Sequence, residues 1–250
     1  PLVVSGEIDV ANIPCNLASI LYNRTEGGIS VVNINTLGVL YIVETGESIQ
    51  SVEDLRGKTI YSTGKGTTPE YVLNHILTQS GIDPLNDVTV EFKSEATEVA
   101  AMLEGSEDAV AVLPQPYVTV AMTKNDSIRI ALDLTEEWEK VVGSSMVTGV
   151  TIVRNEFLEA NPEAIDLFLE EYAASVEYVN TDVEGAAALV GAYDIVAEGV
   201  AKTALPYCNI VSVTGEDMKK SVSDYLSVLY ESDPSSVGGN LPDDSFYSVG

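Results

Sequence analysis

The sequence predicts an α/β protein of two lobes, and three of its features lead to this prediction. Short apolar strands and amphipathic helices alternate regularly from Val52 to Asp133, which is typical of a parallel sheet covered by helices. Strand and helix patterns also flank this block on both sides. Two crossings of the chain, near Asn35–Gly38 and near Leu134–Ser145, connect the block to its flanks.

The crossings set the expected domain boundaries. Residues 1–36 and 143–250 are expected to pack together as a discontinuous first lobe, and residues 37–142 to form an inserted second lobe. Two crossing strands then join the lobes. Clefts at domain interfaces are the usual sites for small ligands, so we expect a ligand in the interlobe cleft.

The first flank has the pattern of a strand, a helix and a long apolar segment. Gly6–Ile13 predicts a short strand, and a helix is expected over Pro14–Tyr22. The segment Ile29–Val43 is nearly continuously apolar, with polar interruptions at Asn33 and at Asn35-Thr36. This pattern predicts a strand buried on both faces, in two pieces with a polar joint between them.

The middle block predicts short elements separated by turns, with Gly81 and Gly105 ending two of its helices. The expected elements are a helical turn at Val52–Leu55, strands at Thr59–Ser62, Val88–Phe92, Ala109–Leu113 and Ile128–Leu132, and helices at Pro69–Ser80, Ala96–Leu103 and Tyr117–Lys124.

The second flank opens with a buried-type strand at Val147–Val153 and is expected to be helical afterwards. Asn161 and Pro162 begin a long helix with one apolar stripe. The stripe consists of Ile165, Phe168, Leu169, Tyr172, Val176 and Val179, and further helices are expected at Val183–Gly191, Ile195–Ala204 and Glu216–Tyr230. The tail from Pro234 to Gly250 has no periodicity and is expected to lie over the surface.

The net charge of −27 restricts the partners of the chain. Binding to nucleic acid or to an anionic membrane needs basic surface, and the 12 Lys and Arg residues form no cluster. We therefore expect no nucleic-acid partner. No apolar run is long enough to span a membrane. The chain starts abruptly at Pro1, and we therefore expect that an upstream segment has been removed.

The cysteine and histidine content argues against a metal site or a cofactor. Cys15 and Cys208 form no CxxC pair, and one histidine, His75, is not enough for a histidine-based zinc site. The two cysteines are compatible with one disulfide in an exported protein or with free thiols, which we favour. His75 falls inside a predicted helix, where a structural role is expected.

A glycine loop between a strand and a helix is the clearest candidate for ligand binding. Gly64-Lys65-Gly66 follows the strand, and Thr67-Thr68-Pro69-Glu70 opens the helix. Free N–H groups at such a helix start can dock an anion or another small molecule. The loop differs from GxxxxGK[ST], and no acidic strand end is placed for Mg²⁺, so nucleotide hydrolysis is excluded.

Several sequence segments, in their order and spacing, resemble the substrate-binding proteins of bacterial ABC importers. The matching segments are Gly6–Ala11, Ser51–Ile60, Gly81-Ile82 with Asp87-Val88, Glu107–Val110 leading to Pro116, and Phe157 with Asn161-Pro162-Glu163. The similarity is to the group that handles sulfonates, taurine, nitrate and thiamin-pyrimidine precursors. It implies a type 2 periplasmic-binding-protein fold, export as a periplasmic protein or cell-surface lipoprotein, a monomeric state and delivery of a small molecule to an ABC permease. The membrane contact would come through a lipid anchor that lies outside this chain.

The chain departs from that family pattern at two places. Gln115 stands where the family usually has an acidic residue before the proline, so a cation contact there is in doubt. The family also begins with a strand–helix–strand unit that this sequence lacks. We expect the first lobe to be incomplete without it, with unpaired backbone at the Ile8–Val10 strand.

The resemblance and the rule that ligands bind at the carboxyl ends of strands together give the candidate ligand contacts. Each residue also has a structural reading, as a turn, capping, crossing-strand or solvated residue. The candidates are Asn12, Asn16, Thr36, Lys65, Thr67, Thr68 and Gln115.

The expected function is binding without catalysis, with no catalytic residue. The ligand is expected to be a small polar molecule such as a sulfonate, a carboxylate or a pyrimidine. An enzyme of the same fold acting on a thiamin-pyrimidine substrate is the alternative. Fungal enzymes of that kind depend on a cysteine-rich motif that this chain lacks, and Cys15 and His75 are expected in different lobes.

Overall fold

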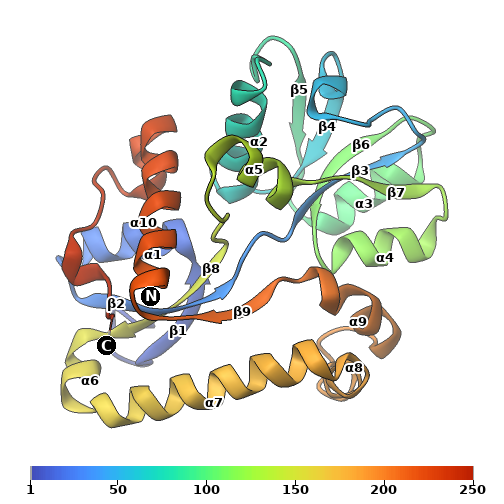
Figure 1. Ribbon diagram of the computed structural model, residues 1–250. Coiled ribbons are helices and arrows are strands. Elements are labelled where there is room, and N and C mark those ends of the chain that lie inside the picture. The colour runs from blue at the N-terminus through green and yellow to red at the C-terminus, as the bar shows by residue number, and fades with distance from the viewer. Residues whose placement is uncertain (1, 250) are drawn as a thin grey trace. The chain divides into compact units, whose positions relative to one another are not determined.

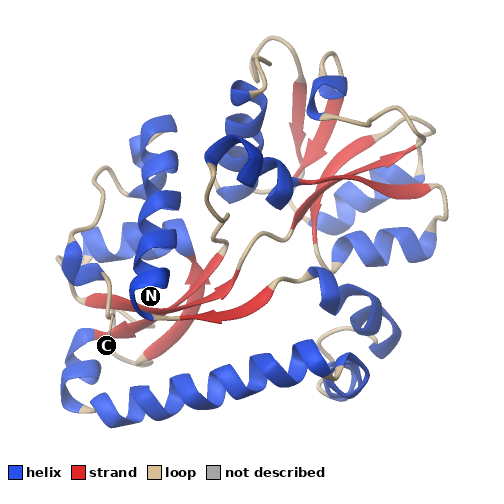
Figure 2. Cartoon of the chain, viewed as in Figure 1, coloured by secondary structure: helices blue, strands red, loops and turns tan. Residues whose placement is uncertain are grey.

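The computed structural model describes residues 2–249, which divide into two compact units. The chain passes from one unit to the other four times, where the sequence predicted two crossings. Unit 1 consists of Pro1–Leu37, Ser144–Val183 and Asn209–Gly250, and unit 2 consists of Gly38–Gly143 and Glu184–Cys208. The segment Glu184–Cys208, expected in the first lobe, thus groups with the inserted block. In both units helices cover a sheet (Figures 1 and 2).

Unit 1 is built on a four-stranded sheet in the order β1-β8-β2-β9. Strand β8 runs antiparallel to β1 and to β2, and β9 runs antiparallel to β2. The strands are β1 (Val10–Pro14), β2 (Ile29–Thr36), β8 (Gly149–Arg154) and β9 (Ile210–Val213). Strand β9 lies in the region expected to be helical, because four residues are too few to show a clear period. Strand β1 lies at the edge of the sheet.

Helices cover both faces of this sheet. Helices α1 (Cys15–Arg24) and α10 (Gly215–Ser232) lie on one face, and α6 (Asn155–Ala160) and α7 (Pro162–Thr181) lie on the other (Figure 1). The stripe predicted on α7 is present, but Ile165 is its one fully buried member. Ile165 packs with Val32 and Val153 of the sheet.

The tail lies over the surface for most of its length, as expected, but it inserts two apolar residues into the core. Its 3₁₀ turns η3 (Pro234–Val237) and η4 (Asp244–Phe246) insert Val237 and Phe246 into the core, where both are fully buried. Ser19 donates a hydrogen bond to the Val237 carbonyl, and the Phe246 ring packs edge-on against Tyr22. Two isolated apolar residues in a Pro/Gly/Ser segment produce no periodic signal, so the sequence could not show this.

Unit 2 is built on a five-stranded sheet in the order β5-β4-β6-β3-β7. Strands β5, β4 and β6 are parallel, as predicted, but β3 pairs antiparallel with both β6 and β7, so the sheet is mixed. The antiparallel strand is the crossing strand, which enters from unit 1. The strands are β3 (Leu40–Thr45), β4 (Thr59–Ser62), β5 (Thr89–Phe92), β6 (Val110–Pro114) and β7 (Ile128–Asp133).

Helices of the inserted block pack against the sheet of unit 2, and the returning segment Glu184–Cys208 adds further helices. The elements are η1 (Val52–Leu55), α2 (Thr68–Gln79), α3 (Ala96–Glu104), α4 (Tyr117–Lys124), α5 (Leu134–Val142), α8 (Val183–Ala192), α9 (Glu198–Ala204) and η2 (Leu205–Tyr207). Helix α5 was not predicted, and its Trp138 is fully buried. Helix α9 packs against α4, and Tyr41 of β3 donates a hydrogen bond to the Tyr207 carbonyl, which holds the returning segment in unit 2.

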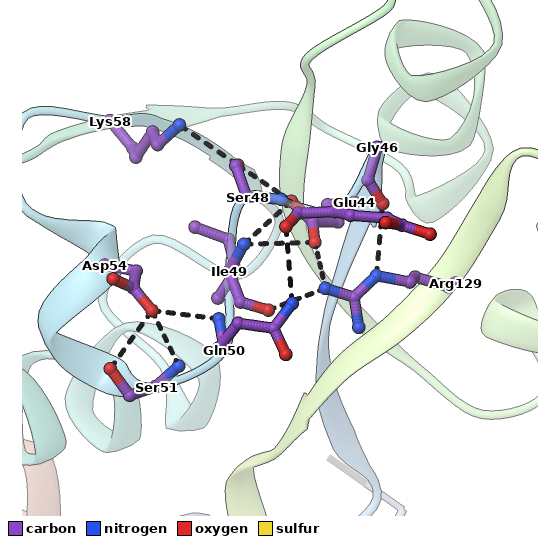
Figure 3. A network of polar contacts seen from close by, with 10 residues as sticks. Glu44, Gly46, Ser48, Ile49, Gln50, Ser51, Asp54, Lys58 and Arg129 are labelled. Atoms are coloured by element: carbon purple, nitrogen blue, oxygen red, sulfur yellow. Dashed lines mark hydrogen bonds and ion pairs between the residues drawn. The ribbon is translucent and has the colours of Figure 1, made fainter.

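An ion pair between the buried Glu44 and the partly exposed Arg129 fixes the loop between β3 and β4 (Figure 3). The Glu44 side chain is 1% exposed and accepts hydrogen bonds from Ser48, from the Ile49 N–H and from Arg129. Arg129 also donates to the carbonyls of Gly46 and Ile49. Burial by itself raises the pKa of the Glu44 carboxyl. The hydrogen bonds from Ile49 and Ser48 and the charge of Arg129 outweigh it, so this pKa lies below its ordinary value.

We expect Glu44→Gln to lower the free energy of unfolding by about 2 kcal/mol near pH 7, because the loop loses a charged acceptor and Arg129 loses its partner. A carboxyl whose pKa is depressed by folding stabilises above its unfolded pKa of about 4.3, and this stabilisation disappears as the pH falls through the folded pKa. The difference between wild type and variant should therefore shrink below about pH 4.5. Urea unfolding across the pH range measures it, with exposed Glu171→Gln as control. A difference independent of pH would contradict this account.

Candidate functional site

In unit 1 a row of uncharged polar side chains crosses three strands of the sheet. The Thr151 hydroxyl donates to Asn12 Oδ1 at 2.8 Å, Asn35 Nδ2 donates to Thr151 Oγ1 at 3.3 Å, and Thr36 Oγ1 donates to Asn35 Oδ1 at 2.9 Å. The register explains this row, because Thr151 of β8 lies opposite both Asn12 of β1 and Asn33 of β2. The structure thus brings the predicted residues Asn12 and Thr36 into one network.

Asn33 adds an unused donor to this row. It is fully buried, and its Oδ1 accepts from Ser212 of β9 at 3.4 Å. Its Nδ2 has no hydrogen-bond partner among the residues that the structure describes. Buried amide groups are normally paired, so this end of the row is suited to accept a polar group or a water molecule.

Asn16 and the tail are linked at the start of α1. Asn16 is 7% exposed and its Nδ2 donates to the Ser236 carbonyl at 3.3 Å. This contact anchors η3. Asn16 therefore has a structural role, whether or not it also contacts a ligand.

In unit 2 the two predicted loops come to the same edge of the sheet. Strands β4 and β6 are parallel neighbours, with Tyr61 opposite Ala111. Their carboxyl ends, Ser62 and Pro114, therefore face the same edge. The loop before α2 and the residue Gln115 follow these two ends, so the sheet brings Lys65, Thr67, Thr68 and Gln115 to one side of unit 2.

The start of α2 is partly satisfied by the chain itself. Thr67 is the residue before the helix, and its hydroxyl donates to the Gly64 carbonyl at 2.6 Å. The Gly66 N–H donates to the carboxylate of Glu70, in the first turn. Gly64 is required here, because its φ is +73° and a Cβ would collide with Thr67 Oγ1. A negative side chain of the protein thus already occupies part of the predicted anion dock.

Two predicted residues at this helix start differ in accessibility. Thr68 is buried, at 8% exposure. Lys65 is exposed, and no ion pair is found for it within residues 2–249. The Lys65 ammonium is therefore accessible to an anionic group.

Gln115 lines a cavity of about 230 Å³ inside unit 2. The residue is 8% exposed, and its Oε1 accepts from the Thr119 hydroxyl at 2.9 Å. Met122 and Ile130 supply apolar wall, and Tyr207 lies on the side of α9. The sequence singled out Gln115 but gave no signal for Tyr207, because the return of the chain to unit 2 was not predicted.

The residues needed for nucleophilic chemistry are poorly placed. Both cysteines are free thiols, Cys15 is fully buried, and burial raises the pKa of its thiol. His75 lies in unit 2, with its ring 5.1 Å from that of Trp138, whereas Cys15 lies in unit 1. A buried thiol with a raised pKa is a weak nucleophile.

Between residues 2 and 249 no group of three His, Cys, Asp or Glu side chains is arranged to hold a metal ion. In the same range no helix combines the length and the apolar character needed to cross a membrane.

Sequence reasoning missed part of the polar row. Asn33 and Asn35 were visible as interruptions of an apolar run, and their amides prove to be part of the row. Thr151 and Ser212 gave no such signal, since single hydroxyl residues are common in strands.

We expect Gly149→Ala to disrupt the polar row. A Cβ at position 149 would overlap Asn35 Oδ1 and crowd the Thr36 side chain, so the Asn35 amide must move away from Thr151. The variant should lose about 1–3 kcal/mol of stability. Chemical denaturation measures this, with Gly199→Ala as control, because outside its own helix no atom lies within 4 Å of the added methyl group there. Equal stability of the two variants would show that the row tolerates rearrangement.

Solved structures with the same fold include transport proteins and an enzyme. An ABC transporter protein from Parabacteroides distasonis is 22% identical with a TM-score of 0.81, and the match covers 99% of this chain and 83% of that one. The periplasmic aliphatic sulphonate binding protein SsuA from Escherichia coli is 16% identical with a TM-score of 0.75, covering 95% and 76%. The desulfurization enzyme DSZB is 12% identical with a TM-score of 0.68, covering 96% and 82%.

These neighbours confirm the predicted fold, a mixed α/β structure with two sheets like that of periplasmic binding proteins. A search among curated proteins finds no match for this sequence. A family model described as NMT1/THI5 like matches residues 24–186, which is more than half of the chain. The chain therefore belongs to the NMT1/THI5-like family.

Proposed function

We propose that this protein is the solute-binding component of an ABC import system. The observation that carries the proposal is the two-unit fold, which this chain shares over nearly its whole length with an ABC transporter protein and a periplasmic sulphonate-binding protein. In this role the protein is exported, acts as a monomer and delivers its ligand to a membrane permease. A lipid anchor outside the present chain would hold it at the membrane.

The proposed ligand contacts come from both units. Asn12 and Thr36 contribute uncharged groups from the polar row, and Lys65 and Gln115 contribute from the strand ends of unit 2. Asn16, Thr67 and Thr68 hold the adjoining segments in place and are proposed as secondary contacts. A ligand that contacts both units stabilises the closed arrangement, so affinity and closure are linked.

Scattering and native mass spectrometry test this mechanism. Protein purified without refolding should retain a small solute, visible as an added mass under gentle ionisation. Removing and restoring that solute should raise and lower the radius of gyration, because binding closes the two units. Protein that carries no solute, or a radius that stays constant at saturation, would count against a hinged binding protein.

The ligand class is open between an anion and a pyrimidine-like molecule. Lys65 favours a sulfonate or a carboxylate, and the charge of −27 opposes it only weakly, because salt screens distant charges beyond about 8–10 Å. Amides and hydroxyls in the polar row and at Gln115 suit a neutral ring equally well. The name of the sulphonate-binding neighbour supports the anion as the first choice to test.

If the retained ligand is an anion, we expect Lys65→Ala to lower the affinity for it by about tenfold or more, since a charge-assisted hydrogen bond is lost. Titration calorimetry of the identified solute measures the change. Lys124→Ala is the control, because this exposed lysine lies on α4 of the same unit, where it pairs with Glu104 on the surface. Unchanged affinity in the Lys65 variant would remove the anion argument and leave the neutral ligand.

An enzyme of the same fold, acting on a thiamin-pyrimidine substrate, is the second candidate. The enzyme among the structural neighbours favours it, although that neighbour is only 12% identical. Incubation of the protein with its retained solute followed by product analysis separates the two functions. Recovery of the solute unchanged supports binding, and a new product supports catalysis.

A further inference from the structure

The cavity lined by Gln115 lies entirely among residues of unit 2. It lies where α9 packs against α4 (Figure 1), and Ile130 of β7 and Tyr207 of η2 complete its lining. Two of its lining residues are fixed by the fold. Gln115 follows the end of β6, and the Tyr41 hydroxyl donates to the carbonyl of Tyr207, a second lining residue, at 2.9 Å.

The orientation of the Gln115 amide is determined by its neighbours. Its Oε1 accepts from both the N–H and the hydroxyl of Thr119, at 3.4 and 2.9 Å. A flipped amide would place an NH₂ group against the Thr119 N–H, two donors facing each other. The NH₂ group of Gln115 therefore points away from Thr119, and no partner is found for it in the described part of the chain. Gln115 is 8% exposed, so the remaining access to its NH₂ group is through the cavity, where two N–H donors are available to a bound molecule.

The hydroxyls of the cavity offer the complementary function. Thr119 donates its proton to Gln115, Thr123 donates to the Thr119 carbonyl at 2.8 Å, and Thr203 donates to the Gly199 carbonyl at 3.3 Å. A hydroxyl that has donated its single proton keeps lone pairs. The wall therefore presents N–H donors at Gln115 and oxygen acceptors at the threonines.

Charge is absent from this lining. The lining side chains are an amide, threonine hydroxyls, a tyrosine and the apolar Met122 and Ile130. An ion placed here would lose hydration without gaining a counter-charge, which is costly. A volume of about 230 Å³ suits one small ring or one end of a larger molecule.

We propose that this cavity binds an uncharged carboxamide or lactam group. Its carbonyl oxygen accepts from the Gln115 amide, its N–H donates to a threonine hydroxyl, and its carbon body lies against Met122 and Ile130. The inference deepens the proposed function and rests on it, because it assigns the chemistry of one end of the solute. It is independent of whether Lys65 holds an anion at another place.

The matched pair benzamide and benzoate tests this proposal on the whole chain. They share one ring and differ in the group that the cavity is proposed to recognise. Methyl-labelled methionine gives four resonances, and Met122 is the one in the cavity, whereas Met218 is buried in unit 1. Benzamide should shift the Met122 methyl signal and leave Met218 unchanged, with an affinity about tenfold above that of benzoate.

Gln115→Glu provides the second arm. The substitution keeps the shape and the acceptor oxygen but replaces the donor NH₂ by oxygen, so it should weaken benzamide about tenfold. Gln79→Glu makes the same chemical change at an exposed position of α2 and should leave binding unchanged. The melting temperature of each variant verifies that it is folded.

Three results would overturn the inference. The first is a Met122 signal that does not shift at millimolar benzamide, which means that the cavity holds solvent only. The second is benzoate binding as tightly as benzamide. The third is equal affinity of the wild type and Gln115→Glu for benzamide. None of them affects the proposed function, which is judged by the retained solute and by closure. Loss of both the solute and closure would instead remove the proposed function itself.

Discussion

The antiparallel pairing of β8 with both β1 and β2 is the constraint on which unit 1 depends. Strand β8 lies between strands that precede it by more than 100 residues, so the sheet forms only when the chain returns from unit 2. Long-range pairing of this kind costs loop-closure entropy before any contact is gained. The same strand carries Thr151, the centre of the polar row, so closing the sheet and completing the polar groups are one event.

In unit 2 the candidate side chains follow the ends of strands, so the sheet determines where they lie. Parallel strands β4 and β6 bring the loop before α2 and Gln115 to one edge of the sheet, and the Glu44–Arg129 pair fixes the β3–β4 loop at the opposite edge. Hydrogen bonds to Glu44 from the backbone and from Ser48 satisfy the buried carboxylate, so burial of the charge is tolerated. Side chains and loops held by hydrogen bonds of this kind have little conformational freedom.

The charge of the molecule and the chemistry of its candidate sites differ sharply. The protein carries a net charge of −27, yet the polar groups of the polar row and of the Gln115 cavity are amides and hydroxyls. Hydrogen bonds within the protein orient these groups, as the Thr119 hydroxyl does for Gln115. Uncharged, oriented groups discriminate by hydrogen-bond pattern, because a ligand with a mismatched group leaves a buried donor or acceptor unpaired.

The sequence by itself determined the local elements and the fold class. Glycine and proline punctuation placed β4, α2 and α4 within one residue of their observed bounds, and the apolar run with polar joints gave β2 and β3. The tertiary structure alone decided that Glu184–Cys208 joins unit 2, that β9 forms a strand, that β3 runs antiparallel and that Phe246 enters the core. The reason is physical. Periodicity reports which face of an element is apolar, whereas the partner that covers that face is set by packing between segments far apart in the chain.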